Sequence, residues 1–134
     1  MNEFLTAHHA LVSWAEKTPE RIFLHQPVDG DMRTYSWQQS ADECRRMASA
    51  LLGLGLQRGD KVAILAKNSA EWMLADVAIS MAGLVSVPIY PTAGVDTISY
   101  VLGHSEASAV FIGKLDEPQV AIDAVPRSIP SIAF

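Results

Sequence analysis

Three closely spaced glycines are the first candidates for ligand chemistry in this sequence, because glycine-rich loops bring backbone amides to phosphate groups. Gly53, Gly55 and Gly59 stand between a predicted helix and a predicted strand. The dinucleotide-binding fingerprint needs the reverse order of elements and a spacing one residue shorter. No sequence of the form G-x-x-x-x-G-K-[ST] occurs in the chain. The glycines are therefore interpreted as the end of a helix and a turn, and not as a phosphate site.

Histidine and cysteine, frequent metal ligands and nucleophiles, are also poorly placed for chemistry. The histidines at positions 8, 9, 25 and 104 have no spacing that brings two of them and a carboxylate to one helical face. Cys44 is the only cysteine, which excludes an intrachain disulfide and a cysteine-built metal site. It lies on the apolar face of a predicted helix, so we interpret it as a core residue with no depressed pKa. The sequence predicts no metal site and no catalytic residue.

More informative are polar residues that follow two predicted strands, since ligands of open α/β sheets bind at the carboxyl ends of strands. Asn68 follows the first of these strands, and Tyr90 and Thr92 follow the second. Asn68 is interpreted first as a cap for the next helix and second as a ligand contact. Tyr90 lies in a turn that the prolines at positions 88 and 91 are expected to make rigid. We take Asn68, Tyr90 and Thr92 as candidates for the edge of a substrate cleft.

The elements that must position these residues follow from the spacing of apolar side chains. An opening helix has its inner face at Phe4, Ala7, Leu11, Trp14 and Ala15 and ends at Thr18-Pro19. Residues 21–27 and 32–36 are predicted strands of a hairpin, with Asp29-Gly30-Asp31 between them. Ser36 and Gln39 form a capping-box pattern that begins the next helix. This second helix is expected to bury Trp37, Ala41, Cys44, Ala48 and Leu51 and to end at Gly53 or Gly55. Trp14, Trp37 and Trp72 are all interpreted as core-filling residues.

From there, predicted strands and helices alternate. The strands are residues 62–66, 84–88, 109–112 and 132–134, and the helices are 69–82, 95–102 and 117–124. This pattern predicts an α/β fold: a three-layer open sheet, mainly parallel, preceded by the helix and the hairpin. The helix at 72–82 is apolar nearly all round, so it should be buried on more than one side by protein outside this chain. Because the chain ends in an apolar predicted strand, we expect a partial domain from a truncated chain.

Composition narrows the classes of partner. The 134 residues carry a formal net charge of −5, which argues against nucleic-acid binding. The N-terminus lacks the pattern of a signal peptide, and the most apolar stretch is too short and interrupted to span a membrane. We therefore expect a cytoplasmic protein with no transmembrane segment, and we leave peripheral attachment of the complete enzyme to a membrane open. Homo-oligomers through exposed apolar edges are also left open.

Four stretches in order resemble the adenylate-forming, AMP-binding superfamily of acyl-coenzyme A synthetases, luciferases and adenylation domains. They are residues 34–56, 59–72, 75–92 and 98–116, which together cover most of the chain. Within them, PIYPT at residues 88–92 and GKLD at residues 113–116 are similar to the long-chain fatty acyl branch. The resemblance implies that residues 1–134 are the N-terminal part of the large adenylate-forming domain, with the remainder of the same chain as its first partner.

For the complete enzyme, the resemblance implies a long-chain fatty acid–CoA ligase that uses a fatty acid, ATP, Mg²⁺ and coenzyme A. The family's phosphate-binding loop, ribose-binding acid and catalytic lysine match no position here, so we expect the chain alone to be inactive and to bind no cofactor. Two alternatives stay open. One is another branch of the superfamily, which activates an aryl or amino acid. The other is a freestanding α/β binding or interaction module that uses the strand ends around Asn68 and Tyr90.

Overall fold

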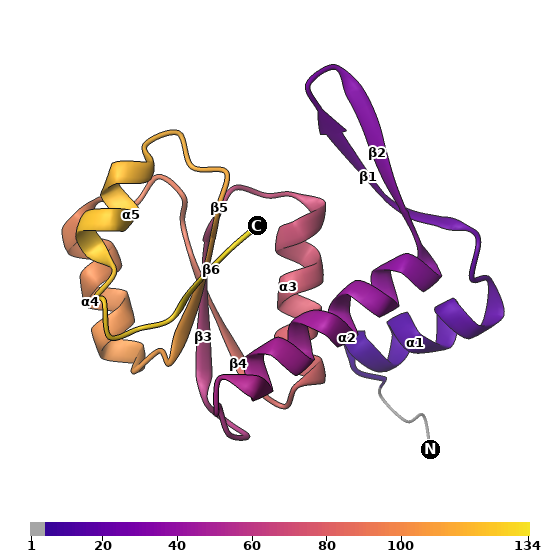
Figure 1. The fold of residues 1–134 in the computed structure, drawn as a ribbon, viewed down its shortest axis with the longest axis horizontal. Coiled ribbons are helices and arrows are strands. Elements are labelled where there is room, and N and C mark those ends of the chain that lie inside the picture. Colours follow the sequence, from indigo (N-terminus) through magenta and orange to yellow (C-terminus); the bar gives the residue numbers. More distant parts are fainter. Residues whose placement is uncertain (1–4) are drawn as a thin grey trace.

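The computed structural model describes residues 5–134, in which helices and strands follow the predicted order (Figure 1). The elements are α1 (Ala7–Lys17), β1 (Ile22–Val28), β2 (Asp31–Ser36), α2 (Trp37–Gly53), β3 (Lys61–Ala66), α3 (Ala70–Met81), β4 (Val85–Ile89), α4 (Val95–Ser105), β5 (Ala109–Gly113), α5 (Pro118–Ala124) and β6 (Ser131–Ala133). Phe4, predicted on the inner face of the first helix, lies outside the described residues.

Four strands form a parallel sheet in the order β4-β3-β5-β6. Helix α3 lies on one face, and α4 and α5 lie on the other (Figure 1). The predicted three-layer α/β sheet is therefore confirmed. One detail differs: Pro88 pairs with Ile64 inside the edge strand β4 and does not belong to the turn. An edge strand tolerates proline because one side of its backbone has no partner that needs an N–H.

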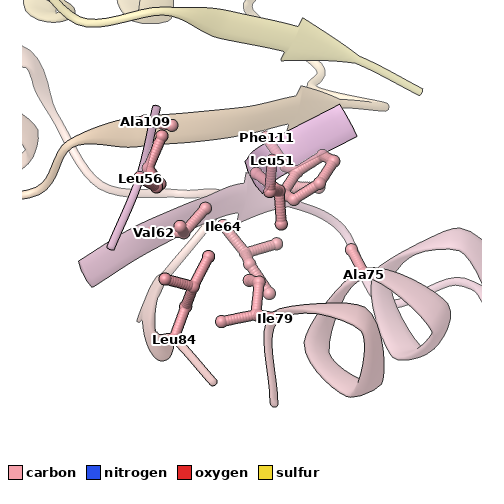
Figure 2. Packing of buried hydrophobic residues seen from close by; sticks show 10 residues of the cluster. Leu51, Leu56, Val62, Ile64, Ala75, Ile79, Leu84, Ala109 and Phe111 are labelled. Carbon is pink, nitrogen blue, oxygen red and sulfur yellow. The ribbon is translucent and has the colours of Figure 1, made fainter. Parts of the chain in front are cut away.

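Both faces of the sheet are packed, because β3 and β5 send alternate apolar side chains to opposite sides. Figure 2 shows one side, where Ile64 and Phe111 meet Leu51 of α2 and Ile79 of α3. The other side packs against α4 and α5 through Leu65 and its neighbours. Burying one such aliphatic side chain stabilises a fold by about 1.5–3 kcal/mol. Most of the apolar burial thus lies around these central strands.

Helix α3 is buried on two sides, as its composition predicted. Ala75 and Ile79 face the sheet, whereas Leu74 and Ala78 face a second cluster formed with α1, α2 and the hairpin. The second side is therefore covered by helices of this same chain. The expectation that protein outside the chain must cover it is wrong, because the packing partners precede α3 in the sequence.

The hairpin has the predicted turn, although Asp31 already belongs to β2. Asp29 and Gly30 have φ angles of 49° and 86°, the left-handed conformation that a tight two-residue hairpin turn requires. The hairpin forms its own two-stranded sheet and projects away from the main body (Figure 1). At its end, Ser36 and Gln39 form the predicted capping box of α2. Helix α2 ends at Gly53, and Gly55 follows with φ of 88°.

Trp14 is more exposed than predicted, and Trp37 packs against the core but is only half-buried. Trp14 is 44% exposed and stacks on Trp37 at 5.8 Å between ring centroids. Trp37 is half-buried and stacks on Phe23 at 3.9 Å. These three rings form an aromatic cluster where α1 meets the hairpin. Phe23 and Trp37 pack against the apolar cluster of α1, α2 and α3, whereas Trp14 lies at the exposed edge. Periodicity assigned the rings to the inner faces of helices correctly, but the hairpin covers those faces only in part.

Candidate functional site

The candidate site lies at the carboxyl edge of the parallel sheet, where three loops meet. Residues 67–69 follow β3, residues 90–94 follow β4, and residues 114–117 follow β5. From β3 the chain continues through α3 to β4, at one edge of the sheet. From β5 it continues through α5 to β6, at the opposite edge. Because the two connections diverge, β3 and β5 flank a topological switch point, where open α/β sheets bind ligands.

The structure brings two of the three predicted site residues together. Asn68 and Tyr90 line one open hollow of about 320 Å³, and Trp72 lines the same hollow from α3. Tyr90 is 84% exposed, so the turn presents its side chain to solvent. Thr92 lies in a second hollow, of about 190 Å³, which it shares with Asp116 from the loop after β5. Pro91 lines both hollows and separates them.

Asn68 does not cap helix α3, so the structural interpretation that we favoured for it is wrong. The N-cap is Ser69, whose Oγ accepts a hydrogen bond from the backbone N–H of Trp72 at 3.1 Å. Asn68 is exposed, one residue too early in the chain to reach these amides. Its side chain is therefore left at the rim of the hollow. This position suits a contact with a ligand or with another part of the protein.

A second cap of α3 comes from the hairpin. The backbone N–H of Ala70 donates to Oε1 of Gln26 on β1 at 2.7 Å. The first amides of a helix have no partner within the helix, so a partner from a distant element is stabilising. Nothing local in the sequence signals this contact, because Gln26 stands 44 residues before Ala70.

Glu71 occupies the first turn of α3 and connects three elements. Its Oε1 accepts a hydrogen bond from Tyr35 Oη of β2 at 3.3 Å, and its Oε2 accepts one from Lys114 Nζ at 3.2 Å. A guanidinium nitrogen of Arg33 lies 4.0 Å from Oε1. Burial alone would raise the pKa of Glu71, but its own backbone N–H, Lys114 and Tyr35 outweigh that effect and lower it. Glu71 is therefore a carboxylate, and the positive end of the helix also favours its charge.

Two ion pairs cross the switch point. Lys67, after β3, pairs with Asp116, after β5, and Lys114 pairs with Glu71. Lys67 and Asp116 are both exposed, so this pair contributes little to stability. Lys114 itself has φ of 49°, a left-handed conformation that is uncommon for a residue with a side chain. None of Gln26, Glu71, Lys114 and Asp116 was predicted to be functional from the sequence. The available signals were the acidic residue in a helix's first turn, for Glu71, and the GKLD stretch at residues 113–116, for Lys114 and Asp116.

Neither Cys44 nor a cluster of possible metal ligands forms a reaction centre within residues 5–134. Burial raises the pKa of Cys44 to about 12, so its thiol stays protonated and packs in the core. No group of three or more His, Cys, Asp or Glu within residues 5–134 converges on a possible metal position. The same residues include no helix that is long and apolar enough to cross a membrane. The arrangement can line a cleft and hold charged side chains at its edge.

Comparisons with known proteins agree with this architecture. The family model described as AMP-binding enzyme matches residues 11–132. The long-chain-fatty-acid–CoA ligase FadD15 of Mycobacterium bovis is 31% identical over 114 residues, which are 85% of this chain and 19% of FadD15. The crystal structure of IdnL1 matches with a TM-score of 0.85 and 26% identity over 99% of this chain and 26% of that one. A fatty acyl CoA synthetase of Mycobacterium tuberculosis matches with a TM-score of 0.81 and 26% identity, over 95% of this chain and 26% of that one.

The match covers most of this chain but only a small part of the relatives' length. The chain spans about a fifth of the length of FadD15, and the matched part is N-terminal. The family model covers nearly all of the parallel sheet, its helices and the hairpin. The chain therefore belongs to the AMP-binding enzyme family and matches the N-terminal part of its acyl-CoA ligases.

Proposed function

We propose that residues 1–134 are the N-terminal part of the large domain of an ATP-dependent long-chain fatty acid–CoA ligase. The observation that carries this proposal is the match of residues 11–132 to the AMP-binding enzyme family. The long-chain branch is supported by the name of FadD15, which is 31% identical to this chain. In the complete enzyme a fatty acid carboxylate attacks the α-phosphorus of ATP, and pyrophosphate leaves. The thiol of coenzyme A then attacks the acyl carbon, and AMP leaves.

Within this reaction, we assign Asn68, Tyr90 and Thr92 to the edge of the substrate cleft. Support comes from their position after β3 and β4 and from the two hollows that they line. Tyr90 offers an exposed ring and a hydroxyl, and Asn68 offers an amide that donates and accepts. These side chains orient a substrate and do not transfer protons or form covalent bonds.

The chain alone is proposed to be inactive and to work with the rest of its own polypeptide. Adenylation develops negative charge on phosphate oxygens, and catalysis needs cations and amides aimed at that charge in a site closed to water. Residues 5–134 do not fit the magnesium of the reaction, because no acidic cluster converges among them. No step of the chemistry is therefore assigned to residues of this chain. A cytoplasmic location is part of the same proposal.

The test uses the complete polypeptide that contains this chain. Pyrophosphate release and acyl-AMP are measured with hexadecanoate, benzoate and phenylalanine, and we expect kcat/KM to favour hexadecanoate by roughly tenfold or more. Asn68→Ala and Tyr90→Ala are expected to raise KM roughly three- to tenfold with little change in kcat. Preference for benzoate or phenylalanine would assign the enzyme to another branch and contradict the long-chain proposal.

A second measurement separates the ligase from a freestanding binding module. The melting temperature of the 134-residue chain is recorded with and without ATP, magnesium and hexadecanoate. A ligand that binds only the folded state raises the melting temperature. We expect no shift, since the described residues form one edge of a cleft. A saturable shift, or acyl-AMP formed by this chain alone, would favour the independent module.

A further inference from the structure

Besides its packing against α2, the hairpin makes polar contacts with the first turn of α3. Gln26 of β1 accepts from the N–H of Ala70, and Tyr35 of β2 donates to Glu71. Arg33 of β2 approaches the same carboxylate at 4.0 Å. Both strands thus contribute polar contacts to one helix end. The rest of the hairpin projects from the body (Figure 1) and leaves its tip exposed.

Through Glu71 the same contacts reach the cleft. The second carboxylate oxygen of Glu71 accepts a hydrogen bond from Lys114, which directly follows β5 and begins the loop at 114–117. The left-handed φ of Lys114 shows that the loop leaves the strand in a conformation that needs support from its surroundings. Leu115 and Asp116 of this loop line the hollow that contains Thr92. One carboxylate therefore joins the hairpin to two of the three loops at the candidate site.

We propose that the hairpin is a positioning element for the cleft, in which Gln26, Tyr35 and Glu71 fix the start of α3 and the loop after β5 in one arrangement. These are positioning residues, because they act on the cleft through Lys114 and through the helix end. The inference concerns the geometry of this chain and holds whichever acid the complete enzyme activates. It goes beyond the cleft-edge assignment, because none of the three residues lines either hollow beside Asn68, Tyr90 or Thr92.

The charged and polar groups around Glu71 indicate which contacts contribute most to the link between the hairpin and the loop after β5. The groups that face Glu71 are Arg33 and Tyr35 from β2 and Lys114 from the loop after β5. Glu43 from α2 also faces it, because Glu43 and Glu71 line a third hollow together. The Glu71 side chain is 15% exposed, whereas that of Arg33 is 64% exposed. Arg33 is therefore screened by water and contributes little. The hydrogen bonds of Tyr35 and Lys114 to a half-buried carboxylate are the stronger link.

The first test is Tyr35→Phe, which removes one hydroxyl and keeps the ring. Backbone amide chemical shifts of the intact protein are measured by NMR. We expect the resonances of residues 115–117 to shift, although the removed bond ends on Glu71 and not on this loop. Tyr100→Phe is the matched control, since Tyr100 is 66% exposed on α4. The proposal is overturned if the loop resonances respond no more to Tyr35→Phe than to the control.

If the hairpin and the loop after β5 are coupled, the coupling must also be reciprocal. Lys114→Met is expected to shift the resonances of the Ala70 amide and the Gln26 side-chain amide. Tyr35→Phe should weaken the folding equilibrium constant about fivefold in the native sequence and about twofold or less beside Glu71→Gln. Asp42→Asn, which removes a surface pair with Arg45 on the same helix, serves as the control for loss of charge. Independent effects of Tyr35→Phe and Glu71→Gln would contradict the shared link.

If Glu71→Gln does not fold, the reciprocal shifts of Tyr35→Phe and Lys114→Met still decide the question. In the complete enzyme, Tyr35→Phe should change KM for one substrate more than kcat, because the cleft is displaced and the reacting groups are kept. The NMR shifts do not depend on activity. An inactive enzyme with coupled resonances would contradict only the ligase proposal, and an active enzyme with uncoupled resonances would contradict only the positioning proposal.

Discussion

The parallel sheet and the hairpin differ in how much of each strand is buried. In β3, five consecutive residues are buried, and both faces of the strand are covered by helices. In β2, only the last two residues, Tyr35 and Ser36, are buried. Central parallel strands are held by apolar contacts on two faces, whereas an isolated two-stranded hairpin is marginal in water. The hairpin must therefore take its position from contacts at its base, which are polar at the first turn of α3 and aromatic where Phe23 stacks on Trp37.

This difference separates stability from positioning in the molecule. The sheet supplies most of the buried apolar surface, while the hairpin reaches the first turn of α3, which lies beside the candidate cleft. Substitutions in the sheet should change the free energy of unfolding strongly. Substitutions at the hairpin's polar contacts should change it less and should affect the loops at the strand ends more.

The largest effect is expected for Phe111→Ala in β5. Phe111 is fully buried against Ile64, Leu51 and Ile79, and removal of such a ring costs about 3–5 kcal/mol of unfolding free energy. Met32→Ala in the hairpin should cost less than about 0.5 kcal/mol, since Met32 is 57% exposed. Urea unfolding followed by circular dichroism measures both. Equal losses would break the contrast between the two regions.

Gly113→Ala should have the next largest effect, at the end of the same strand. A Cβ at this position would overlap a ring carbon of Phe134, which stacks on Phe111. Overpacking of this kind costs about 1–3 kcal/mol. Phe134→Ala should relieve most of the cost in the double variant, so the two substitutions should be clearly non-additive in unfolding experiments. An additive pair would show that the ring moves aside freely.

Most of the sheet could be predicted from the sequence because its signals are local. Predicted strands of three to five residues, separated by amphipathic or apolar helices, indicated the βα order, and Ser36 with Gln39 indicated the start of α2. The hairpin turn followed from Asp29 and Gly30 for the same reason. Each of these features depends on residues within one or two turns of each other, where spacing determines geometry.

What escaped prediction depends on contacts between distant segments. The choice of Ser69 over Asn68 as the cap depends on where β3 ends, and the contact of Gln26 with Ala70 depends on how the hairpin docks. The exposure of Trp14 likewise depends on how much of α1 the hairpin covers. The sequence was sufficient to locate the strand ends that form the candidate cleft. It was not sufficient to predict the ion pairs that Lys67 and Lys114 make across the cleft.

A smaller effect, dependent on pH, is expected for Glu71→Gln at the junction of the two regions. Burial opposes ionisation of Glu71, yet its backbone N–H, Lys114 and Tyr35 hold its pKa below the ordinary value of 4.5. A carboxyl whose pKa is lower in the folded state stabilises the fold above the unfolded pKa and loses that contribution as pH falls through the folded pKa. The variant should therefore lose about 1–2 kcal/mol near neutral pH and converge with the native protein in acid. Urea unfolding from pH 7 to about pH 3 checks this, and a difference constant across that range would contradict it.

The smallest effect on stability is expected at the N-terminal cap of α3, where this helix meets the hairpin. Ser69→Ala removes the acceptor for the Trp72 amide and should cost about 1 kcal/mol of unfolding free energy. Asn68→Ala, one residue earlier, should stay within about 0.5 kcal/mol, because its exposed side chain caps nothing. If Ser69→Ala proves neutral, Gln26 alone secures the helix end, and the hairpin contributes more to stability than its exposure suggests. Combining Ser69→Ala with Gln26→Leu decides between these outcomes, since two separate caps on one helix end should give losses that add.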